Sequence, residues 1–377
     1  MPNLINADPQ SEKNPDERMT YSSAGVKSGE DLGLKGVLET IRATFSFRAG
    51  RGRPVLDLGY FANVLDLGSN LGLAIATDGV GTKVLIAEML GKYDTIGIDC
   101  VAMNANDVLC VGAEPISLVD YIAVEMARPE VLEEIAKGLS EGAKLAGINI
   151  PGGEVAQVPE LIRGVDGGMG CDLVGTCVGL VALDKIVDGR RVEPGDVVMG
   201  LKSSGIHSNG LTLARKALLK RTGYDLSDYI PELGRSLGEE LLEPTRIYVS
   251  EITALLKSDV RVKALAHITG DGLLNLTRVA ADVGFEIDNL PEPQPIFELI
   301  QKAGNVEIEE MYRVFNMGIG FCAVVAREDA DKAVAIIESF GAECWPIGRA
   351  VADSQKRIRL PQPGLVSEGD SFERYRI

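Results

Sequence analysis

The stretch between Leu71 and Lys83 constrains the chain most, because an apolar segment runs directly into glycines and charged residues. The apolar segment ends in the β-branched Thr77, as a buried strand would. It is followed by Asp78, Gly79, Gly81, Thr82 and Lys83. Glycines let a backbone pass close to a ligand and leave its amide groups free to face an anion. A tight strand-to-helix turn with a surface lysine would have the same residues, so the local pattern leaves both interpretations open.

Asp78 and Lys83 suggest what such a turn could bind. Lys83 can supply a positive charge to a phosphate. Asp78 is anionic, and it would repel a phosphate unless a cation lay between them. We therefore interpret the turn as a magnesium–nucleotide site, since magnesium commonly binds one or two carboxylates together with phosphate oxygens. It is not a Walker A loop, because the pattern Gly-x-x-x-x-Gly-Lys-Ser/Thr is absent from the sequence.

Length and charge exclude several classes of protein. The 377 residues predict two or three domains. Lys and Arg number 38 against 55 Asp and Glu, which gives a formal net charge of -17. A nucleic-acid partner would need a basic face, so we expect none. The sequence has no run of about 18 apolar residues and no apolar signal region at its start, so we expect no membrane span and no secretion signal.

The cysteines and histidines bear on metal and redox chemistry. No two of the six cysteines form a Cys-x-x-Cys pair, and only two histidines are present, so a zinc site is not expected. Scattered cysteines are typical of reduced thiols in the cytoplasm. His207 and His267 both lie in glycine-rich loops after apolar strands. A neutral histidine that caps a loop is the usual explanation, and a polar binding site is the alternative.

Two further segments combine regular structure with acidic side chains. The stretch 94–111 is predicted to be a helix, on which Asn104 and Asp107 are neighbours because they are three residues apart. A buried helix that keeps them together suggests a ligand, although a hydrogen-bonded structural carboxylate explains the pair equally well. Residues 147–159 predict a short strand and a glycine turn, in which Gly152 and Gly153 precede Glu154. Glu154 is thus a third candidate acid.

A polar segment that ends in Pro-Gly, residues 184–195, marks the predicted domain boundary. Beyond it, a strand at 197–201 leads into the Gly/Ser loop 203–210 and a helix at 211–222. Helices are also predicted at about 237–257 and 273–281, on either side of a strand that ends at His267. Residues 1–19 are expected to form a flexible tail, and the polar residues after 353 a frayed one.

In their order along the chain, these motifs resemble the aminoimidazole ribonucleotide synthetase family, also called phosphoribosylformylglycinamidine cyclo-ligase, over residues 20–350. The matching segments in the first half are Tyr21…Ala24-Gly25-Val26, Thr77-Asp-Gly-Val-Gly-Thr-Lys83, Asp94-Thr-Ile-Gly-Ile-Asp99, Asn106-Asp107, Gly112-Ala-Glu-Pro115, Asp120-Tyr121 and Gly152-Gly-Glu154. Those in the second half are Ser203-Ser-Gly205…His207-Ser-Asn-Gly210, Pro244-Thr-Arg-Ile-Tyr248, Ala266-His-Ile-Thr-Gly270 and Glu310-Met-Tyr-Arg313…Phe315-Asn-Met-Gly318. Any one of these segments would be a weak match, but so many in the family's order make chance improbable.

The resemblance implies a mixed α/β (α+β) fold of two domains and a cytoplasmic homodimer. Residues 20–183 would form the N-terminal domain, which binds ATP and completes a barrel across the dimer. Residues 184–353 would form a C-terminal mixed sheet with helices, and residues 1–19 and 354–377 would be tails. Nucleotide would bind in the cleft, under the glycine-rich N-terminal loop.

The resemblance also implies roles for individual residues. Asp78, Asp107 and Glu154 would hold Mg²⁺. The catalytic candidates are His207, as proton shuttle or phosphate clamp, together with Lys27 and Asp107. Lys27 and Lys83 would meet the phosphates of ATP, and Asn209 would line the substrate side. The remaining candidates for binding the nucleotide are Gly25, Gly79, Gly81, Thr82, Gly152, Gly153, Ser204, Gly210, His267 and Thr269.

The reaction implied by the resemblance converts ATP and formylglycinamidine ribonucleotide to aminoimidazole ribonucleotide, ADP and phosphate. Transfer of the γ-phosphoryl group to the formyl oxygen would turn a poor leaving group into phosphate. The ribosyl-bearing nitrogen would then attack the same carbon and close the ring. Such chemistry needs aligned reactants and spread charge, and it needs no covalent nucleophile on the protein.

Departures from the family pattern keep alternatives open. The chain has Leu58-Gly-Tyr-Phe-Ala62 for a Gly-Gly-Phe-Gly-Ala segment, Val155 for threonine, and Asp271 for a glycine. These changes spare the acids and the histidines but bear on substrate contacts. The alternatives are another ATP-using enzyme of the same superfamily and a non-catalytic nucleotide-binding paralogue.

Three relatives in the superfamily differ from this chain at recognisable positions. Selenophosphate synthetase carries a reactive cysteine or selenocysteine near its N-terminus, whereas the first cysteine here is Cys100. The carbamoyl dehydratase of hydrogenase maturation needs a C-terminal cysteine, whereas this chain ends at Ile377. Thiamine-monophosphate kinase lacks the His-Ser-Asn-Gly loop that is present here. The cyclo-ligase is therefore the favoured prediction.

Overall fold

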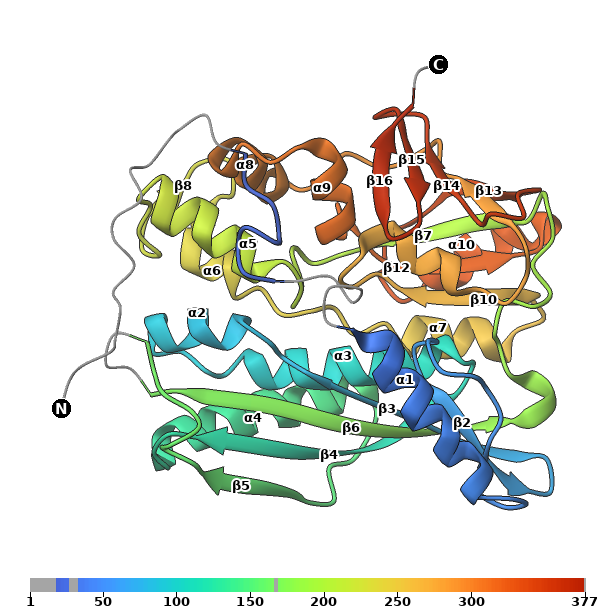
Figure 1. The fold of residues 1–377 in the computed structure, drawn as a ribbon, viewed down its shortest axis with the longest axis horizontal. Coiled ribbons are helices and arrows are strands. Elements are labelled where there is room, and N and C mark those ends of the chain that lie inside the picture. Colours follow the sequence, from blue (N-terminus) through green and yellow to red (C-terminus); the bar gives the residue numbers. More distant parts are fainter. Residues whose placement is uncertain (1–17, 27–32, 166–168, 376–377) are drawn as a thin grey trace.

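Two large sheets, each with its own helices, divide the chain (Figure 1), and a small third sheet pairs β8 (Tyr229–Ile230) with β9 (Arg235–Ser236). The computed structural model describes residues 18–26, 33–165 and 169–375. The first sheet has the strand order β1-β2-β3-β6-β4-β5. Its strands are β1 (Arg53–Pro54), β2 (Asn63–Gly68), β3 (Leu71–Gly79), β4 (Glu114–Val124), β5 (Gly153–Gln157) and β6 (Cys171–Ala182). All pairings are antiparallel except that of β4 with β5, so the sheet is mixed.

Helices α2 (Lys83–Leu90) and α3 (Ile96–Cys110) lie between this sheet and the second domain (Figure 1), and α4 (Pro129–Ala146) packs against α3. α4 begins with a proline in its first turn and ends at Gly147, whose left-handed backbone favours glycine. Gly97 on α3 and Gly138 on α4 allow the two helices to touch, because a Cβ on either would lie within 3.0 Å of backbone atoms of the other segment. α3 is thereby fixed between the sheet and α4.

The face of the first sheet that points away from α3 is apolar and exposed. Ile75, Val119, Tyr121 and Leu180 are between 37% and 45% exposed. The strand register places all of them on this face, since the residues of β6 that are paired with Ile75, Val119 and Tyr121 alternate in phase with Leu180. α1 (Leu34–Ala43) follows the same pattern, because none of its residues is buried. The domain thus leaves apolar surface uncovered in a single chain.

The second sheet has eight strands in the order β10-β12-β7-β13-β11-β14-β15-β16. Its first five strands are β7 (Val197–Lys202), β10 (Val262–His267), β11 (Gly284–Glu286), β12 (Ile319–Val325) and β13 (Cys344–Val351). Its helices are α5 (Leu211–Arg215), α6 (Leu237–Leu241), α7 (Val249–Lys257), α8 (Pro295–Gly304), α9 (Ile308–Val314) and α10 (Ala330–Glu338). β12, which lies between β10 and β7, is buried along its whole length, so it belongs to the core of this domain.

The C-terminal residues were predicted to form a frayed tail, and the structure corrects this prediction. They contain β14 (Ile358–Leu360), β15 (Leu365–Glu368) and β16 (Ser371–Arg374), which extend the second sheet. Ile358, Leu360 and Leu365 are completely buried. Each strand is short and has few apolar residues, so its pattern is weak in the sequence although its buried residues belong to the core.

The described part of the N-terminal segment, residues 18–26, lies on the C-terminal domain. Met19 donates its backbone N–H to the Gly304 carbonyl, and the Tyr21 N–H donates to Glu310 at 2.6 Å.

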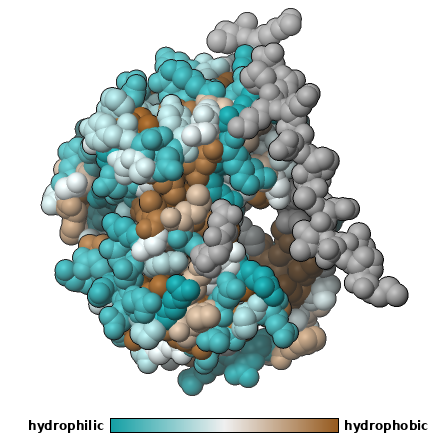
Figure 2. Space-filling view, turned by 90° about the vertical axis from the view of Figure 1, so that its left-hand side faces the viewer, coloured by the Kyte–Doolittle hydropathy of each residue, from teal (hydrophilic) through white to brown (hydrophobic). Residues whose placement is uncertain are grey.

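Apolar side chains appear among hydrophilic ones at mid-height of the surface shown in Figure 2. Within the described ranges, no helix is both long and apolar enough to cross a membrane.

Candidate functional site

One helix, α3, carries most of the polar contacts between the two domains. Asn106 is fully buried, accepts the Tyr248 N–H at 3.0 Å and donates to the Arg246 carbonyl at 2.9 Å. The same helix presents Asp99 and Asp107 to the C-terminal domain. Their partners lie in the segment 243–248, which separates α6 from α7, on β10 and in the loop that contains Ser208. The single helix predicted over 237–257 is therefore wrong, because Pro244 and the contacts with α3 hold an extended segment in its middle.

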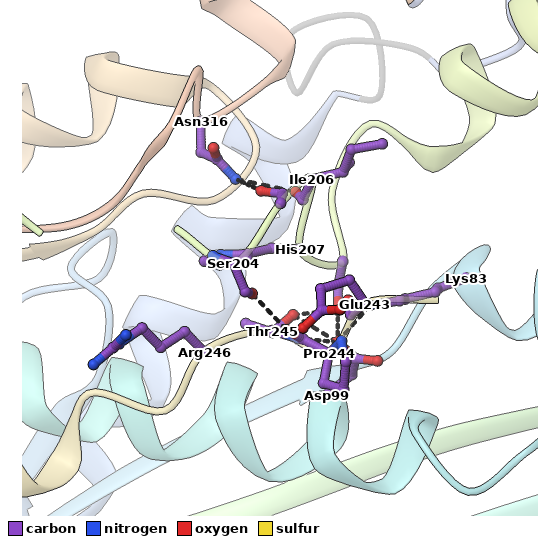
Figure 3. Close-up of polar contacts among 12 residues, drawn as sticks. Lys83, Asp99, Ser204, Ile206, His207, Glu243, Pro244, Thr245, Arg246 and Asn316 are labelled. Carbon is purple, nitrogen blue, oxygen red and sulfur yellow. Dashed lines mark hydrogen bonds and ion pairs between the residues drawn. The ribbon is translucent and has the colours of Figure 1, made fainter. Parts of the chain in front are cut away.

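Lys83 is placed differently from the phosphate ligand that was predicted. Its side chain has no exposed surface, and its Nζ donates to Asp99 Oδ1 at 2.9 Å and to the Glu243 carbonyl. Asp99 Oδ1 also accepts hydrogen bonds from the Thr245 N–H and hydroxyl, at 2.7 and 2.6 Å, and from Ser208 at 3.2 Å. Figure 3 shows these side chains converging while Arg246 points away. Lys83 is therefore a structural cation at the domain junction, and the structure does not support a phosphate contact for it.

Asp78 lies near the end of β3, where its backbone is held by α3. The Asn104 side chain accepts the Asp78 N–H at 2.9 Å and donates to the Asp78 carbonyl at 3.1 Å. Burial raises the pKa of the Asp78 carboxyl, and the nearby Asp107 charge raises it further. Gly175 on the adjacent strand leaves room for this arrangement, because a Cβ there would lie 2.8 Å from Asn104 Nδ2. Asn104 thus fixes Asp78 beside a second carboxylate.

Asp107 is paired with His267 from the other domain. The Nδ1 atom of His267 is 2.9 Å from Asp107 Oδ1, the imidazole is fully buried, and the carboxylate side chain keeps 17% exposure. His267 was predicted to bind the nucleotide, but its ring lies against Phe321 and Asn106 instead. The pair therefore brings the end of β10 onto α3, close to Asp78.

Glu154 does not join Asp78 and Asp107, so the predicted triad of carboxylates is wrong for a single chain. Asp78 is in register with Gly175, Asp120 and Gly153 across the sheet, and these positions face α3. Glu154 is one residue further along β5 and is in register with Tyr121, so it points to the exposed face. Within the described residues, no group of three or more His, Cys, Asp and Glu side chains is arranged to hold a metal ion.

His207 lies inside the C-terminal domain and not at an open surface. Its side chain is 2% exposed, and its Nε2 accepts the Ser204 N–H at 3.1 Å. Burial, followed by the nearby His267, Lys83 and Arg246, lowers its pKa well below the usual range, so the ring is neutral. Gly320 is required beside it, since a Cβ there would lie within 3.0 Å of the ring. The structure thus favours the loop-capping role of His207 over the predicted proton shuttle.

The remaining predicted residues are spread around this junction. Ser204 donates its hydroxyl to the Pro244 carbonyl, and Thr82 is hydrogen bonded to Thr212 at 2.9 Å. Asn209 Nδ2 is buried and has no hydrogen-bond partner in the described part of the chain. Gly79 ends β3 beside Asp78, and Gly81, Gly210 and Thr269 lie in the turns near Asp78, His207 and His267, whereas Gly152 and Gly153 lie at the exposed edge strand β5. A Cβ atom added to Gly25 would lie 3.8 Å from the Nζ atom of Lys216. Lys27 falls outside the described residues.

Sequence reasoning missed the residues that hold the candidate site together. Asn106 was noticed only as the neighbour of Asp107, and Thr245 only as a member of the segment Pro244–Tyr248, and neither was given a role. No local pattern reveals their roles, because their partners are about 140 residues away in the sequence. A surface cavity of about 360 Å³ also exists, lined by residues of the linker and β10, including Lys185, Val187, Arg261 and Lys263. It contains none of the predicted residues, and Arg261 and Lys263 are already paired with Asp329 and Asp196.

Comparison with known proteins identifies the family. The model of the N-terminal domain of AIR synthase related proteins matches residues 59–181, and the model of their C-terminal domain matches residues 193–361. The chain belongs to the AIR synthase related family. The phosphoribosylformylglycinamidine cyclo-ligase of Methanothermobacter thermautotrophicus is 48% identical over 91% of this chain and 97% of that protein. The cyclo-ligase of Pyrococcus furiosus is 53% identical over 85% of this chain and 92% of that protein.

The solved structures with a similar fold are more distant in sequence. Thiamine-monophosphate kinase from Stenotrophomonas maltophilia has a TM-score of 0.58 at 21% identity, covering 85% of this chain and 94% of that chain. The structure of AaThiL complexed with AMPPCP and TMP has a TM-score of 0.60 at 15% identity, covering 89% and 96% of the respective chains. At such identities the likeness concerns the fold alone, and it confirms the predicted mixed α/β architecture.

Proposed function

We propose that this protein catalyses the ATP-dependent closure of formylglycinamidine ribonucleotide to aminoimidazole ribonucleotide, ADP and phosphate. The identity of about half of all residues to curated cyclo-ligases, over nearly their whole length, carries the proposal. The site geometry is consistent with it, because Asp78 and Asp107 lie near enough to interact electrostatically, and both are held by hydrogen bonds at the domain junction. The ATP analogue in the distantly related AaThiL structure shows that this fold can hold a nucleoside triphosphate.

This reaction requires the protein to align two reactants and to stabilise the charge on the transferred phosphoryl group. Transfer of the γ-phosphoryl group to the formyl oxygen creates an imidate whose leaving group is phosphate. Attack by the ribosyl-bearing nitrogen on the same carbon forms the new C–N bond and expels that phosphate. The oxygen of the formyl group therefore leaves in the phosphate. A rigid junction such as the one around Asp99 and Asn106 can keep the two domains, and the reactants between them, aligned.

The residues present fit a Mg²⁺ ion, although with two protein ligands from one chain and not three. Burial and the nearby Asp107 charge raise the pKa of the Asp78 carboxyl, and a cation bound there would relieve the repulsion. Magnesium often binds through one or two carboxylates and completes its shell with water and substrate phosphates. Bound there, it would neutralise charge on the phosphoryl group that is transferred. Lys83 takes no part in this proposal.

We also propose a cytoplasmic homodimer. The exposed apolar face of the first sheet, with Ile75, Val119, Tyr121 and Leu180, is a surface that a second copy would cover. Glu154 lies on this face, so it could reach a ligand only at the interface between two copies. All six cysteines are free and buried, which suits a reducing compartment. Light scattering should give twice the chain mass, and Tyr121→Arg should lower it to one chain while Lys137→Glu, on the exposed side of α4, should not.

The direct test of the function is incubation of the full chain with ATP, Mg²⁺ and formylglycinamidine ribonucleotide, followed by an aromatic-amine assay for aminoimidazole product. One ADP should appear for each product molecule. ATP hydrolysis with no ring product would favour another ATP-using enzyme of the superfamily. Nucleotide binding with no turnover would favour a non-catalytic paralogue.

A further inference from the structure

His267 has a protein partner at each ring nitrogen. Its Nδ1 atom is 2.9 Å from Asp107 Oδ1, and its Nε2 atom is 3.4 Å from the Nδ2 atom of Asn106. The ring has no exposed surface and lies 6.2 Å from the Phe321 ring, centroid to centroid. The histidine therefore sits in a closed pocket that leaves neither nitrogen directed at a substrate.

The partners of His267 decide which nitrogen carries the proton. The Asn106 carboxamide oxygen is committed to the Tyr248 N–H at 3.0 Å, so the group that Asn106 turns towards His267 is its NH₂. A donor facing Nε2 makes that nitrogen an acceptor. The proton is then on Nδ1, which donates it to the Asp107 carboxylate. This assignment follows from the hydrogen-bond network.

We propose that His267 is a positioning residue. Its Nδ1–H group donates a hydrogen bond to Asp107 and so orients that carboxylate for a divalent cation. Asp107 keeps part of its side chain exposed, whereas His267 keeps none. Among the described residues, His267 is the hydrogen-bond partner found for the Asp107 carboxylate. The Asn104 side chain fixes the backbone of Asp78, so a different residue positions each of the two acids. The inference rests on the proposed magnesium role of Asp107.

Two amide variants separate the hydrogen bond from the packing of the ring. In His267→Asn the amide NH₂ falls close to the place of Nδ1 and can still donate to Asp107. In His267→Gln the amide reaches the place of Nε2 and loses that donor. The titration uses the full chain without nucleotide and Mn²⁺ as the probe, and free Mn²⁺ is followed by electron paramagnetic resonance. Partners that orient a metal ligand typically contribute about 10- to 100-fold in metal affinity.

We expect His267→Gln to weaken Mn²⁺ binding about 10- to 100-fold, while His267→Asn stays within a small factor of the wild type. Phe321→Leu serves as the matched control, because it loosens the packing around the ring and keeps the hydrogen bond. It should lower the melting temperature without changing Mn²⁺ affinity. Equal losses in both histidine variants, or none in either, would overturn the positioning role. A wild-type chain that binds no Mn²⁺ would overturn the proposed metal pair itself, whereas Mn²⁺ binding without ring closure would count only against the proposed reaction.

Discussion

Lys83 and Asp99 form an ion pair of 2.9 Å in which neither side chain has any exposed surface. Both residues belong to the N-terminal domain, yet Lys83 also donates to the Glu243 carbonyl, and Asp99 accepts from Thr245 and Ser208 of the C-terminal domain. The pair therefore links the two domains at the junction. Its burial makes each charge dependent on the other, since an unpaired buried charge is strongly unfavourable.

Replacing one member of this ion pair should destabilise the protein more than replacing both. We expect Asp99→Asn alone to cost about 3–5 kcal/mol of unfolding free energy, because it leaves the Lys83 ammonium buried without a counter-charge. Adding Lys83→Met should regain a large part of this loss, since the asparagine oxygen can still accept from Thr245. Denaturant titration measures both variants. The matched control applies the same single and double replacements to the partly buried Lys263–Asp196 pair, which lies within the C-terminal domain. A double variant no more stable than the single one would contradict the account.

The same double variant tests whether Lys83 contacts a phosphate. A charged hydrogen bond contributes about 1.5–3 kcal/mol, so losing a phosphate contact would raise the KM for ATP roughly tenfold or more. The structure engages the ammonium with Asp99 and Glu243, so we expect the KM for ATP to change far less than this. Steady-state kinetics at saturating second substrate give the value. A large increase would restore the original prediction for Lys83.

Because His207 is neutral in the folded protein, the free energy of unfolding should fall in mild acid. The folded pKa of His207 lies well below the usual range because the ring is buried. The unfolded chain binds a proton below about pH 6.5, while the folded chain does not. The stabilising contribution is therefore complete above that pH and declines as the pH falls towards the folded pKa, by up to about 1.4 kcal/mol per pH unit.

The matched control for this titration is His207→Gln, which can still accept the Ser204 N–H but cannot titrate. Its unfolding free energy should lack the extra decline between pH 6.5 and 5, and its turnover per folded molecule should stay near that of the wild type. A loss of turnover of about 10²-fold or more in a stable variant would instead support a proton-transfer role.

Asp78→Asn should abolish ATP turnover without harming the metal-free fold. Burial and Asp107 raise the folded pKa of Asp78 above its unfolded value. The stability that goes with a raised pKa is present below about pH 4 and is lost as the pH rises through the folded pKa. At pH 7 in chelator the variant should therefore melt at the same temperature as the wild type or higher, and this gain should vanish near pH 4. A variant that melts earlier in chelator and keeps its Mg²⁺-dependent rate would show that Asp78 is a structural residue.

The C-terminal strands should contribute to global stability. Leu365 on β15 is fully buried, so Leu365→Ala should cost about 2–5 kcal/mol. Glu368 on the same strand is exposed, and Glu368→Ala should change stability by no more than about 0.5 kcal/mol. Thermal unfolding of both variants compares them directly. If Leu365→Ala melted with the wild type, the segment would be the frayed tail predicted from its sequence.

Local patterns predicted the elements, and long-range partners decided the roles. The helix predicted over 94–111 is α3 (Ile96–Cys110) in the structure, because its apolar period is a local signal. The side of the sheet to which Glu154 points depends on the register between β4 and β5, which no local pattern contains. Lys83 looks like a phosphate ligand in sequence, since Glu243 lies 160 residues further along. His267 and Asp107 come from different domains, so their pairing was equally out of reach.

The most direct test of the proposed reaction follows one oxygen atom. Formylglycinamidine ribonucleotide carrying ¹⁸O in its formyl group is incubated with ATP, Mg²⁺ and the full chain, and the phosphate is analysed by mass spectrometry. We predict one labelled phosphate for each aminoimidazole ribonucleotide formed, because the formyl oxygen leaves with the transferred phosphoryl group. Asp107→Asn should give neither product. Ring product accompanied by unlabelled phosphate, or ADP without ring product, would contradict the account.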